Sequence, residues 1–489
     1  MLALWAVLMP AYAEPPAATT AVPRAPSTVA FKPCTLAQPG LPTTVAAQCG
    51  TLRVPEDRSR PDGRLIDLQI ARIAASGKQP KADPVVMLAG GPGQSALEAF
   101  PQVAAAFHGV LRERDVILVD QRGTGRSHPL DCPGAEAVET GDLVEPGLAR
   151  DLAEQCLREL RSSADPRFYT TSDYVADLET VRETLGIPQY NLVGISYGTR
   201  VALEYLRRHP DRTRTVVLDS VVPPELILGA EHARNLEHVI NQHFARCEAD
   251  AVCRERFGSP RAKLDALLAG LRAQPQRVTY RDPLTDERRE GTLTATDVAG
   301  VVRLYAYAPQ LFGMLPMTLA AAAAGDYEAL MAHSRMLEQL VGEQISMALQ
   351  LSVSCTEDVP WLQADPRDAG TLLGTAFVDL LRAQCAVWPR GAMPPDFHAP
   401  LHAPQPALLL SGELDPVTPP RYGEAVRRTL PNSRHFTLKG QGHTVLMTGC
   451  VPQLLTQFIA SANAKTLDGG CLDRLIESPP FGGTYGWEP

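Results

Sequence analysis

The sequence predicts an α/β fold in which a mostly parallel central sheet is divided by a large, mainly helical insertion. Short apolar runs alternate with segments of helical periodicity between about residues 51 and 222, and this alternation resumes after about residue 401. Strands that alternate with helices form a parallel sheet with helices on both faces. The stretch between the two regions has helical periodicity over most of its length. A helical block that separates two halves of one sheet is expected to lie over the sheet edge as a lid.

The first half of the predicted sheet begins with strands. Residues 64–73 alternate between apolar and polar side chains, as in a half-buried strand. Residues 84–90 and 115–120 are short apolar runs, which are typical of parallel strands buried on both faces. The remaining expected elements are helices at 149–163 and 173–186, a strand at 190–195, a helix at 197–209 and a strand at 214–222.

The insertion contains one expected hairpin, at residues 277–294. An independent second domain is the alternative to a lid. We favour a lid because the sheet pattern resumes after the insertion together with the remaining candidate catalytic residues. There the expected elements are a strand at 406–412, a helix at 421–430, a strand at 434–438 and a helix at 451–462.

The first residues have features of a signal peptide. An apolar run ends in Ala11-Tyr12-Ala13, which places small residues where signal peptidase requires them, and the run is too short to span a bilayer. No Lys or Arg precedes the run, so a disordered N-terminus is the alternative. The predicted divisions are a signal peptide (1–13), a Pro- and Ala-rich segment (14–48), the first half of the core (49–222), the lid (223–400), the second half of the core (401–475) and a tail (476–489).

Charge and cysteine content exclude some classes of protein. The 489-residue chain has a formal net charge of −9, which argues against a nucleic-acid binder because phosphate contacts need clustered Lys and Arg. Its 10 cysteines lie in neighbouring couples, so disulfides between nearest neighbours are expected in a periplasmic or extracellular chain. No CxxC pair or His/Cys cluster has zinc spacing, so no metal site is predicted. No cofactor is expected. The composition indicates no integral membrane segment and leaves the oligomeric state open.

Ser196 is the candidate nucleophile. It lies in Gly-Ile-Ser-Tyr-Gly (194–198), a GxSxG motif that follows a predicted strand and begins a predicted helix, as a nucleophile elbow does. The flanking glycines permit the tight turn that raises the serine hydroxyl above the sheet. The alternative is a strand-to-helix turn that merely contains a serine.

A serine hydroxyl needs a base, and the base needs an orienting acid. In the α/β-hydrolase fold these residues follow in the order Ser, acid, His. Asp415 and His443 come just after two predicted strands in the second half of the sheet, so we expect them at the edge where Ser196 lies. Glu413, two residues before Asp415, is the nearest rival for the acid.

Two backbone N–H groups are required to stabilise the tetrahedral intermediate. The expected donors are Tyr197, directly after the nucleophile, and Gly91 in the glycine-rich loop 89–93. A phosphate cradle is the alternative for that loop, but the Lys-Ser/Thr ending of a P-loop is missing. Residues 120–127 are expected to form a structural turn rather than to line the site.

The motifs together resemble the proline iminopeptidase and tripeptidyl aminopeptidase family of serine peptidases. They are AGGPGQS (89–95), DQRGTGRS (120–127), GISYGT (194–199), ELDPVTP (413–419) and GQGH (440–443), with CTEDVP (355–360) and CAVWP (385–389) similar to the secreted tripeptidyl aminopeptidases. The resemblance implies a Ser196, Asp415 and His443 triad with Gly91 and Tyr197 as oxyanion donors. It also implies removal of residues from free peptide N-termini. Ala89, where many proline iminopeptidases have His, weakens the case for strict proline specificity.

An aminopeptidase must bind a protonated amine, so a carboxylate is expected to face the pocket. Glu357 and Asp358 are the candidates, with a solvated acidic pair as the alternative, and Thr418 is expected at the pocket border unless it only begins a helix. The expected substrates are small peptides. An esterase or amide hydrolase with the same triad, and an inactive binding protein on the same scaffold, are the competing hypotheses.

Overall fold

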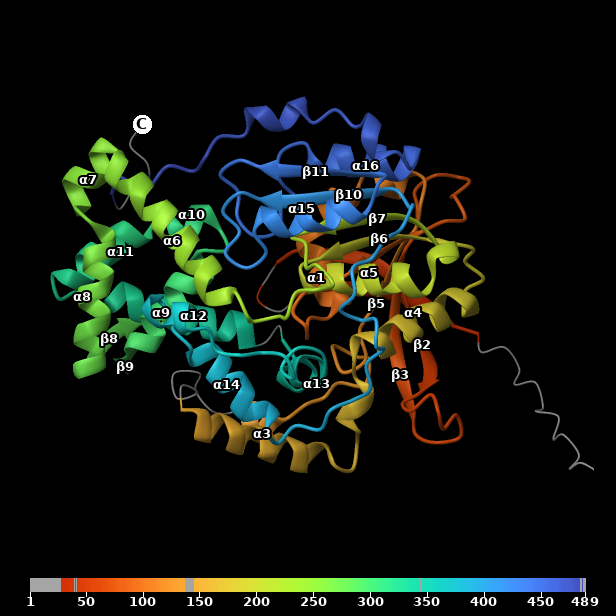
Figure 1. The fold of residues 1–489 in the computed structure, drawn as a ribbon, viewed down its shortest axis with the longest axis horizontal. Helices are drawn as coiled ribbons and strands as arrows, with labels where there is room; N and C mark the ends of the chain where they lie inside the picture. The colour runs from red at the N-terminus through yellow and green to blue at the C-terminus, as the bar shows by residue number, and fades with distance from the viewer. Residues whose placement is uncertain are drawn as a thin grey trace, which may run out of the picture.

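The computed structural model describes residues 28–38, 40, 42–136, 145–342, 345–483 and 486. The predicted signal peptide and residues 14–27 lie outside this range. Within it the chain forms an α/β fold around a nine-stranded, mostly parallel sheet (Figure 1). The predicted fold class is therefore confirmed.

The strand order is β1-β2-β3-β5-β4-β6-β7-β10-β11. From β5 to β11 in this order neighbouring strands are parallel, whereas β1, β2, β3 and β5 pair antiparallel. Every residue of β4, β5, β6 and β10 is buried, as expected for apolar parallel strands. The strands are β1 (Lys32–Ala37), β2 (Thr44–Pro55), β3 (Leu65–Ile73), β4 (Val85–Leu88), β5 (Val116–Val119), β6 (Tyr190–Ile195), β7 (Thr213–Asp219), β10 (Ala407–Gly412) and β11 (Ser433–Leu438).

Alternating side chains of the central strands enter two apolar layers. In β4, Val86 and Leu88 pack with α3, α4, α5 and α15, whereas Val85 and Met87 pack with α1 and α16 on the opposite face. Helices therefore cover both faces. These helices are α1 (Ala96–Val103), α3 (Pro146–Leu160), α4 (Thr171–Thr184), α5 (Tyr197–Arg208), α15 (Pro420–Thr429) and α16 (Val451–Ser461), and a short α2 (Pro133–Glu136) precedes α3.

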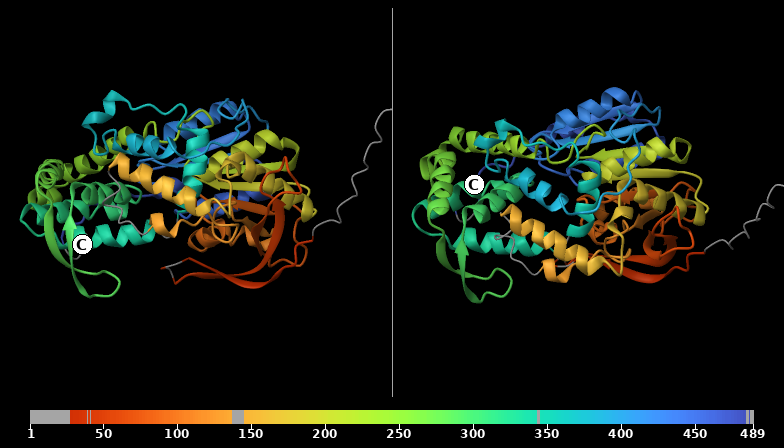
Figure 2. Two further views of the ribbon diagram at one scale, coloured as in Figure 1. Left: turned by 90° about the horizontal axis from the view of Figure 1, so that it is seen from below. Right: turned by 60° about the horizontal axis from the view of Figure 1, so that its bottom comes forward.

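The insertion between β7 and β10 has two parts. Helices α6 to α12 gather at one end of the molecule, beside the sheet, around an apolar cluster of their own, and the expected hairpin is present there as β8–β9 (Figures 1 and 2). Helices α13 and α14 instead join the apolar layer that contains α3. The elements are α6 (His232–Ala249), α7 (Ala251–Phe257), α8 (Pro260–Ala273), β8 (Gln276–Arg281), β9 (Arg288–Leu293), α9 (Ala295–Tyr305), α10 (Pro309–Phe312), α11 (Leu315–Ala323), α12 (Glu328–Gly342), α13 (Met347–Glu357) and α14 (Ala376–Cys385).

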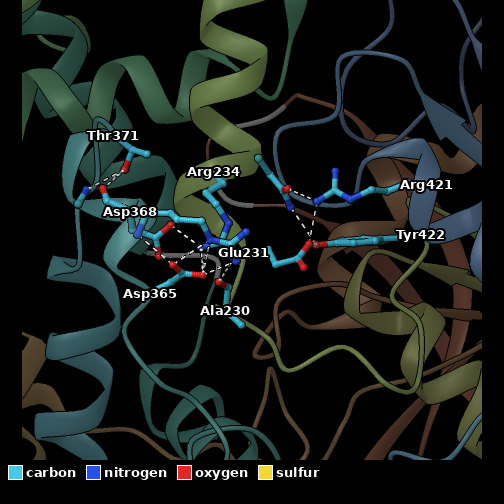
Figure 3. Close-up of polar contacts among 11 residues, drawn as sticks. Ala230, Glu231, Arg234, Asp365, Asp368, Thr371, Arg421 and Tyr422 are labelled. Carbon is cyan, nitrogen blue, oxygen red and sulfur yellow. Dashed lines mark hydrogen bonds and ion pairs between the residues drawn. The ribbon is translucent and has the colours of Figure 1, made fainter.

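The first turn of α6 is bonded on two sides (Figure 3). Glu231, just before the helix, accepts hydrogen bonds from the Tyr422 hydroxyl at 2.5 Å and from Arg421 at 2.7 Å, both on α15 of the core. Arg234 forms ion pairs with Asp368 at 2.6 Å and Asp365 at 3.0 Å within the insertion. These contacts fix the start of α6 relative to the sheet.

The N-terminal part of the fold differs from the expectation. The predicted core begins at residue 49, but that position lies inside β2, and β1 pairs with β2 from Lys32↔Cys49 to Ala37↔Thr44. Most residues of β1 are exposed or half-buried, and the first half of β2 alternates between exposed and half-buried positions. Such edge strands lack the apolar run by which the central strands were identified.

All 10 cysteines form disulfides between sequence neighbours, as expected. The pairs are Cys34–Cys49, Cys132–Cys156, Cys247–Cys253, Cys355–Cys385 and Cys450–Cys471. The described part of the predicted tail returns to the insertion, where the Phe481 N–H donates to the Gly313 carbonyl at 3.0 Å.

The turn after β5 contains a fully buried arginine. The Arg122 guanidinium donates two hydrogen bonds of 2.7 Å to the Asp177 carboxylate on α4, and both side chains are 0% exposed. It also donates to the carbonyls of Glu56 and Phe168, each at 2.8 Å. Arg122 thus joins β2, the turn before α4 and α4 itself, which agrees with the expected structural role of residues 120–127.

We expect the Asp177→Ala variant to lose about 3–5 kcal/mol of unfolding free energy, because it leaves the buried Arg122 charge unpaired. Urea denaturation of both proteins measures the difference. The matched control is Asp67→Ala, which removes the exposed partner of Arg53 and is expected to cost less than about 1 kcal/mol. Equal losses in the two variants would contradict a stabilising role for the buried pair.

Candidate active site

Ser196 lies on a strained turn between β6 and α5. Its φ of 54° and ψ of −123° are unusual for a residue with a Cβ atom. Gly198 lies so close to β4 that an added Cβ would be 2.2 Å from the Leu88 carbonyl oxygen. This close approach explains why glycine is required after the nucleophile position, and the turn matches the predicted elbow.

His443 and Asp415 form a hydrogen-bonded pair after β11 and β10. The His443 Nδ1 atom is 2.8 Å from the Asp415 Oδ2 atom. Asp415 is fully buried and also accepts hydrogen bonds from the N–H groups of Val417 at 2.9 Å and Thr418 at 2.8 Å. An ionised Asp415 fixes the tautomer with a proton on Nδ1, which leaves Nε2 as the proton acceptor.

Glu413, the alternative candidate for the acid, has other partners than His443. Its carboxylate accepts the Gly440 N–H at 2.8 Å and lies 3.6 Å from Arg246. Asp415 is therefore the candidate acid that contacts His443. Thr418 also acts on this pair, because its hydroxyl donates to Asp415 Oδ2 at 2.7 Å and lies 3.3 Å from His443 Nδ1.

The insertion holds the other side of the imidazole. The backbone N–H of His443 donates to the Tyr307 carbonyl at 2.9 Å, and the two side-chain rings meet edge to face with centroids 5.1 Å apart. Tyr307 follows α9. The candidate base is therefore positioned by the sheet and by the insertion together, which the sequence patterns did not reveal.

Burial and charge act in opposite directions on this pair. Burial by itself lowers the pKa of His443, but the carboxylates of Asp415 and, more weakly, Asp219 outweigh it, so that the pKa of His443 is raised above its ordinary value. Burial raises the pKa of Asp415, but the charge and hydrogen bond of His443 and two backbone donors outweigh it and lower the pKa. The pair thus favours an ionised Asp415.

Asp219, at the end of β7, holds the loop that contains His443. Its buried carboxylate accepts the N–H groups of Val445 at 3.0 Å and Leu446 at 2.8 Å. Burial raises the pKa of Asp219 to about 6 in spite of these donors. The next residue, Ser220, accepts the Thr444 N–H at 2.8 Å.

A cavity of about 500 Å³ lies between the sheet edge and the insertion. Ser196, His443, Gly91 and Tyr197 all line it. The Tyr197 N–H belongs to the first turn of α5 and so has no partner within the helix. Gly91 has a φ of 106°, and an added Cβ would be 2.5 Å from the Gly93 nitrogen, so this loop conformation requires glycine. The candidate nucleophile, base and oxyanion donors thus meet at one cavity.

Glu357 and Asp358 do not reach this cavity. The Asp358 carboxylate is fully buried against Arg200 on α5, with contacts of 2.9 Å and 3.0 Å. The Glu357 carboxylate accepts the backbone N–H of Thr171 at 2.7 Å and its hydroxyl at 2.8 Å. The expectation that these acids face a substrate amine is wrong, because adjacent buried donors already bind both carboxylates.

Glu357 instead supports the residue after the nucleophile. The Thr171 hydroxyl that contacts Glu357 is 2.6 Å from the Tyr197 hydroxyl, which joins α13 to the start of α5 through α4. Burial raises the pKa of Glu357 to about 8, although the Arg200 charge opposes this rise.

Polar residues of the insertion that no motif identified also line the cavity. They include His232 on α6 and Arg303 on α9, together with Gln350 and Ser354 on α13. None of the described residues that line the cavity is Asp or Glu. In the described part of the chain no cluster of His, Cys, Asp and Glu is arranged to hold a metal ion.

The chain is similar in sequence to a known protein family and to several named hydrolases and peptidases. A profile of the family described as alpha/beta hydrolase fold matches residues 83–449. Serine protease Hip1 of Mycobacterium tuberculosis is 25% identical over 93% of this chain and 93% of its own length. Tripeptidyl aminopeptidase of Streptomyces lividans is 33% identical over 36% of each protein. Proline iminopeptidase of Neisseria gonorrhoeae is 34% identical over 29% of this chain and 34% of its own. The family resemblance seen in the sequence is confirmed.

We expect Ser196→Ala to reduce kcat by at least about 10⁴-fold, because the hydroxyl oxygen that forms the acyl bond is lost. Hydrolysis of a p-nitrophenyl ester measures the effect. The control is Ser461→Ala, at the end of α16, where an exposed hydroxyl outside the cavity donates to the Gln457 carbonyl and accepts the Asn463 N–H. Retained hydrolysis in Ser196→Ala would remove Ser196 as the nucleophile.

The pH profile tests the base. His443 must be neutral to accept a proton, and its pKa is raised, so kcat/KM is expected to fall as the pH decreases through a midpoint above 6.5. Asp415→Asn removes the charge that raises this pKa, so the midpoint should move to lower pH and kcat should fall by about 10⁴-fold. An unchanged midpoint in Asp415→Asn would contradict the coupling between the two residues.

Proposed function

This chain belongs to the α/β-hydrolase family, and from that premise we propose that it is an exported serine aminopeptidase. It hydrolyses peptide bonds near the free N-termini of short peptides. The observation that supports this most strongly is the meeting of Ser196, on its strained turn, with His443 at one cavity, where His443 is bonded to the buried Asp415. A serine, a neutral imidazole and an ionised acid in this order are suited to acyl transfer.

In the proposed reaction, the Ser196 hydroxyl oxygen attacks the scissile carbonyl carbon and His443 Nε2 takes the hydroxyl proton. The N–H groups of Gly91 and Tyr197 bind the oxyanion. When the tetrahedral intermediate collapses, the C–N bond breaks and His443 gives the proton to the leaving amine. Water then attacks the acyl-enzyme with His443 again as the base, which releases the carboxylic acid and restores Ser196.

Export is supported by the cysteines. Five disulfides that include every cysteine of the chain are typical of proteins that fold in an oxidising compartment. The expected cleavage after Ala13 supplies a route to that compartment. Separately, none of the helices in the described ranges is long and apolar enough to cross a membrane.

The aminopeptidase part of the proposal is supported by the names of the relatives, tripeptidyl aminopeptidase and proline iminopeptidase. One observation favours a second candidate, an esterase or amide hydrolase that acts on small acyl substrates. A protonated amine needs an anionic partner, and the described residues that line the cavity include no carboxylate. The two candidates share the same triad and differ in what the substrate must carry beside the scissile bond.

Matched substrates separate the two candidates. Fluorogenic mono-, di- and tripeptidyl amides are compared with the same compounds carrying an N-acetyl group, and Ser196→Ala supplies the background rate. An aminopeptidase is expected to prefer the free amine by at least about tenfold in kcat/KM, because a charge-assisted contact is lost on acetylation. Equal rates on free and acetylated peptides, or rapid hydrolysis of simple esters alone, would reject the aminopeptidase hypothesis. The esterase or amide hydrolase hypothesis would then remain.

A further inference from the structure

The cavity beside Ser196 contains a cation without an acidic partner. Arg303, in the last turn of α9, lines the cavity and is half-buried. Arginines nearby on α6 and α15 are paired, since Arg234 contacts Asp365 and Asp368 and Arg421 contacts Glu231 (Figure 3). No carboxylate in the described part of the chain forms an ion pair with Arg303. The Arg303 guanidinium therefore has no negatively charged side chain of the described residues beside it in the cavity. An anionic ligand can supply that charge.

Aromatic side chains hold Arg303 in place. Its guanidinium carbon lies 5.4 Å from the centre of the Phe377 ring, which also lines the cavity. Tyr307 lines the same cavity, and the charge of Arg303 opposes the rise that burial causes in the pKa of Tyr307. These neighbours orient the guanidinium without neutralising it, and its five N–H donors exceed the contacts that they use.

His232, the first residue of α6, is a second donor beside Arg303. It lines the same cavity, its ring lies 5.4 Å from that of Phe377, and its buried Nε2 atom has no hydrogen-bond partner. Burial, and then the charge of Arg303, lowers the pKa of His232 to about 4. The imidazole is therefore neutral at ordinary pH, and the tautomer with a proton on Nε2 offers one N–H to a ligand. Its place is fixed by the bonds of Glu231 to α15.

We propose that Arg303, assisted by His232, binds a carboxylate group of the substrate. This inference rests on the proposed function, since it takes the Ser196 cavity as the place of hydrolysis, and it adds the charge of the preferred substrate. Two sources of the carboxylate exist, the C-terminus of a short peptide and an acid on the acyl part. Arg303 lines the cavity together with Tyr307, whose ring contacts that of His443. Since His443 gives the leaving amine its proton, this placement favours the C-terminus of the leaving group.

Two matched substrate pairs test the proposal. The first is trialanine and its C-terminal amide, and the second is p-nitrophenyl hemisuccinate and p-nitrophenyl butyrate. The wild-type enzyme is expected to prefer the carboxylate member of one pair, mainly through KM. Arg303→Gln should reduce that preference by about 10- to 100-fold, because a charge-assisted hydrogen-bonded contact is removed. Arg303→Lys, which keeps the charge but loses the planar fork, should retain part of it.

The control variant is Arg277→Gln, which changes an exposed arginine of the hairpin and should leave both ratios as in the wild type. A purely structural role, in which Arg303 only packs on Phe377, predicts a lower melting temperature with unchanged ratios. Binding is also measured without turnover, as the rise in Tm that trialanine and trialaninamide cause in Ser196→Ala and in Ser196→Ala/Arg303→Gln.

The outcomes distinguish failure of the carboxylate site from failure of Ser196-dependent hydrolysis. A preference for trialanine identifies a C-terminal carboxylate, and a preference for the hemisuccinate identifies an acid on the acyl part. If the wild type discriminates within neither pair, or if Arg303→Gln keeps the wild-type ratios and the Tm difference, the carboxylate site is rejected while Ser196-dependent hydrolysis stands. If Ser196→Ala leaves the rate unchanged, the proposed function fails, and the Tm comparison still decides whether Arg303 binds a carboxylate.

Discussion

A carboxylate as deeply buried as that of Asp415 is stable in its charged form only if the surrounding groups compensate the lost water. The structure supplies His443, the Thr418 hydroxyl and the N–H groups of Val417 and Thr418 for this purpose. The same contacts select the tautomer and orientation of His443. The chemistry of the site therefore depends on one buried ion-pair geometry, and the loops after β10 and β11 are shaped around it.

Several separate segments hold this geometry. Asp219 joins the loop of His443 to β7, which lies on the other side of the insertion in the sequence. Tyr307 fixes the His443 backbone from the insertion. Hydrogen bonds between Glu357 and Thr171 and between Thr171 and Tyr197 connect α13 to the start of α5, beside the nucleophile. Buried polar groups that are this well satisfied are rigid, which pre-organises the site before substrate binds.

Catalysis and substrate selection are assigned to different parts of the fold. The candidate nucleophile, base, acid and oxyanion donors all lie at the carboxyl edge of the sheet, on loops or, for Tyr197, in the first turn of α5, as is usual for open α/β sheets. Polar side chains of the insertion, among them Arg303 and His232, line the same cavity, and these are the residues that we propose to bind the substrate. Under that proposal, a change in the insertion would alter the preferred substrate while the triad is kept.

Local sequence determined much of this protein. The buried central strands are continuous apolar runs, the turn at Ser196 needs glycine where an added Cβ would meet Leu88, and the disulfides join sequence neighbours. The order of Ser196, Asp415 and His443 placed the candidate triad. Only the tertiary structure decided that β1 and the start of β2 extend the sheet, because exposed edge strands have no apolar run. It also decided that Glu357 and Asp358 bind Thr171 and Arg200 whereas Arg303 lines the cavity, because the direction of a side chain depends on how the insertion packs against the sheet.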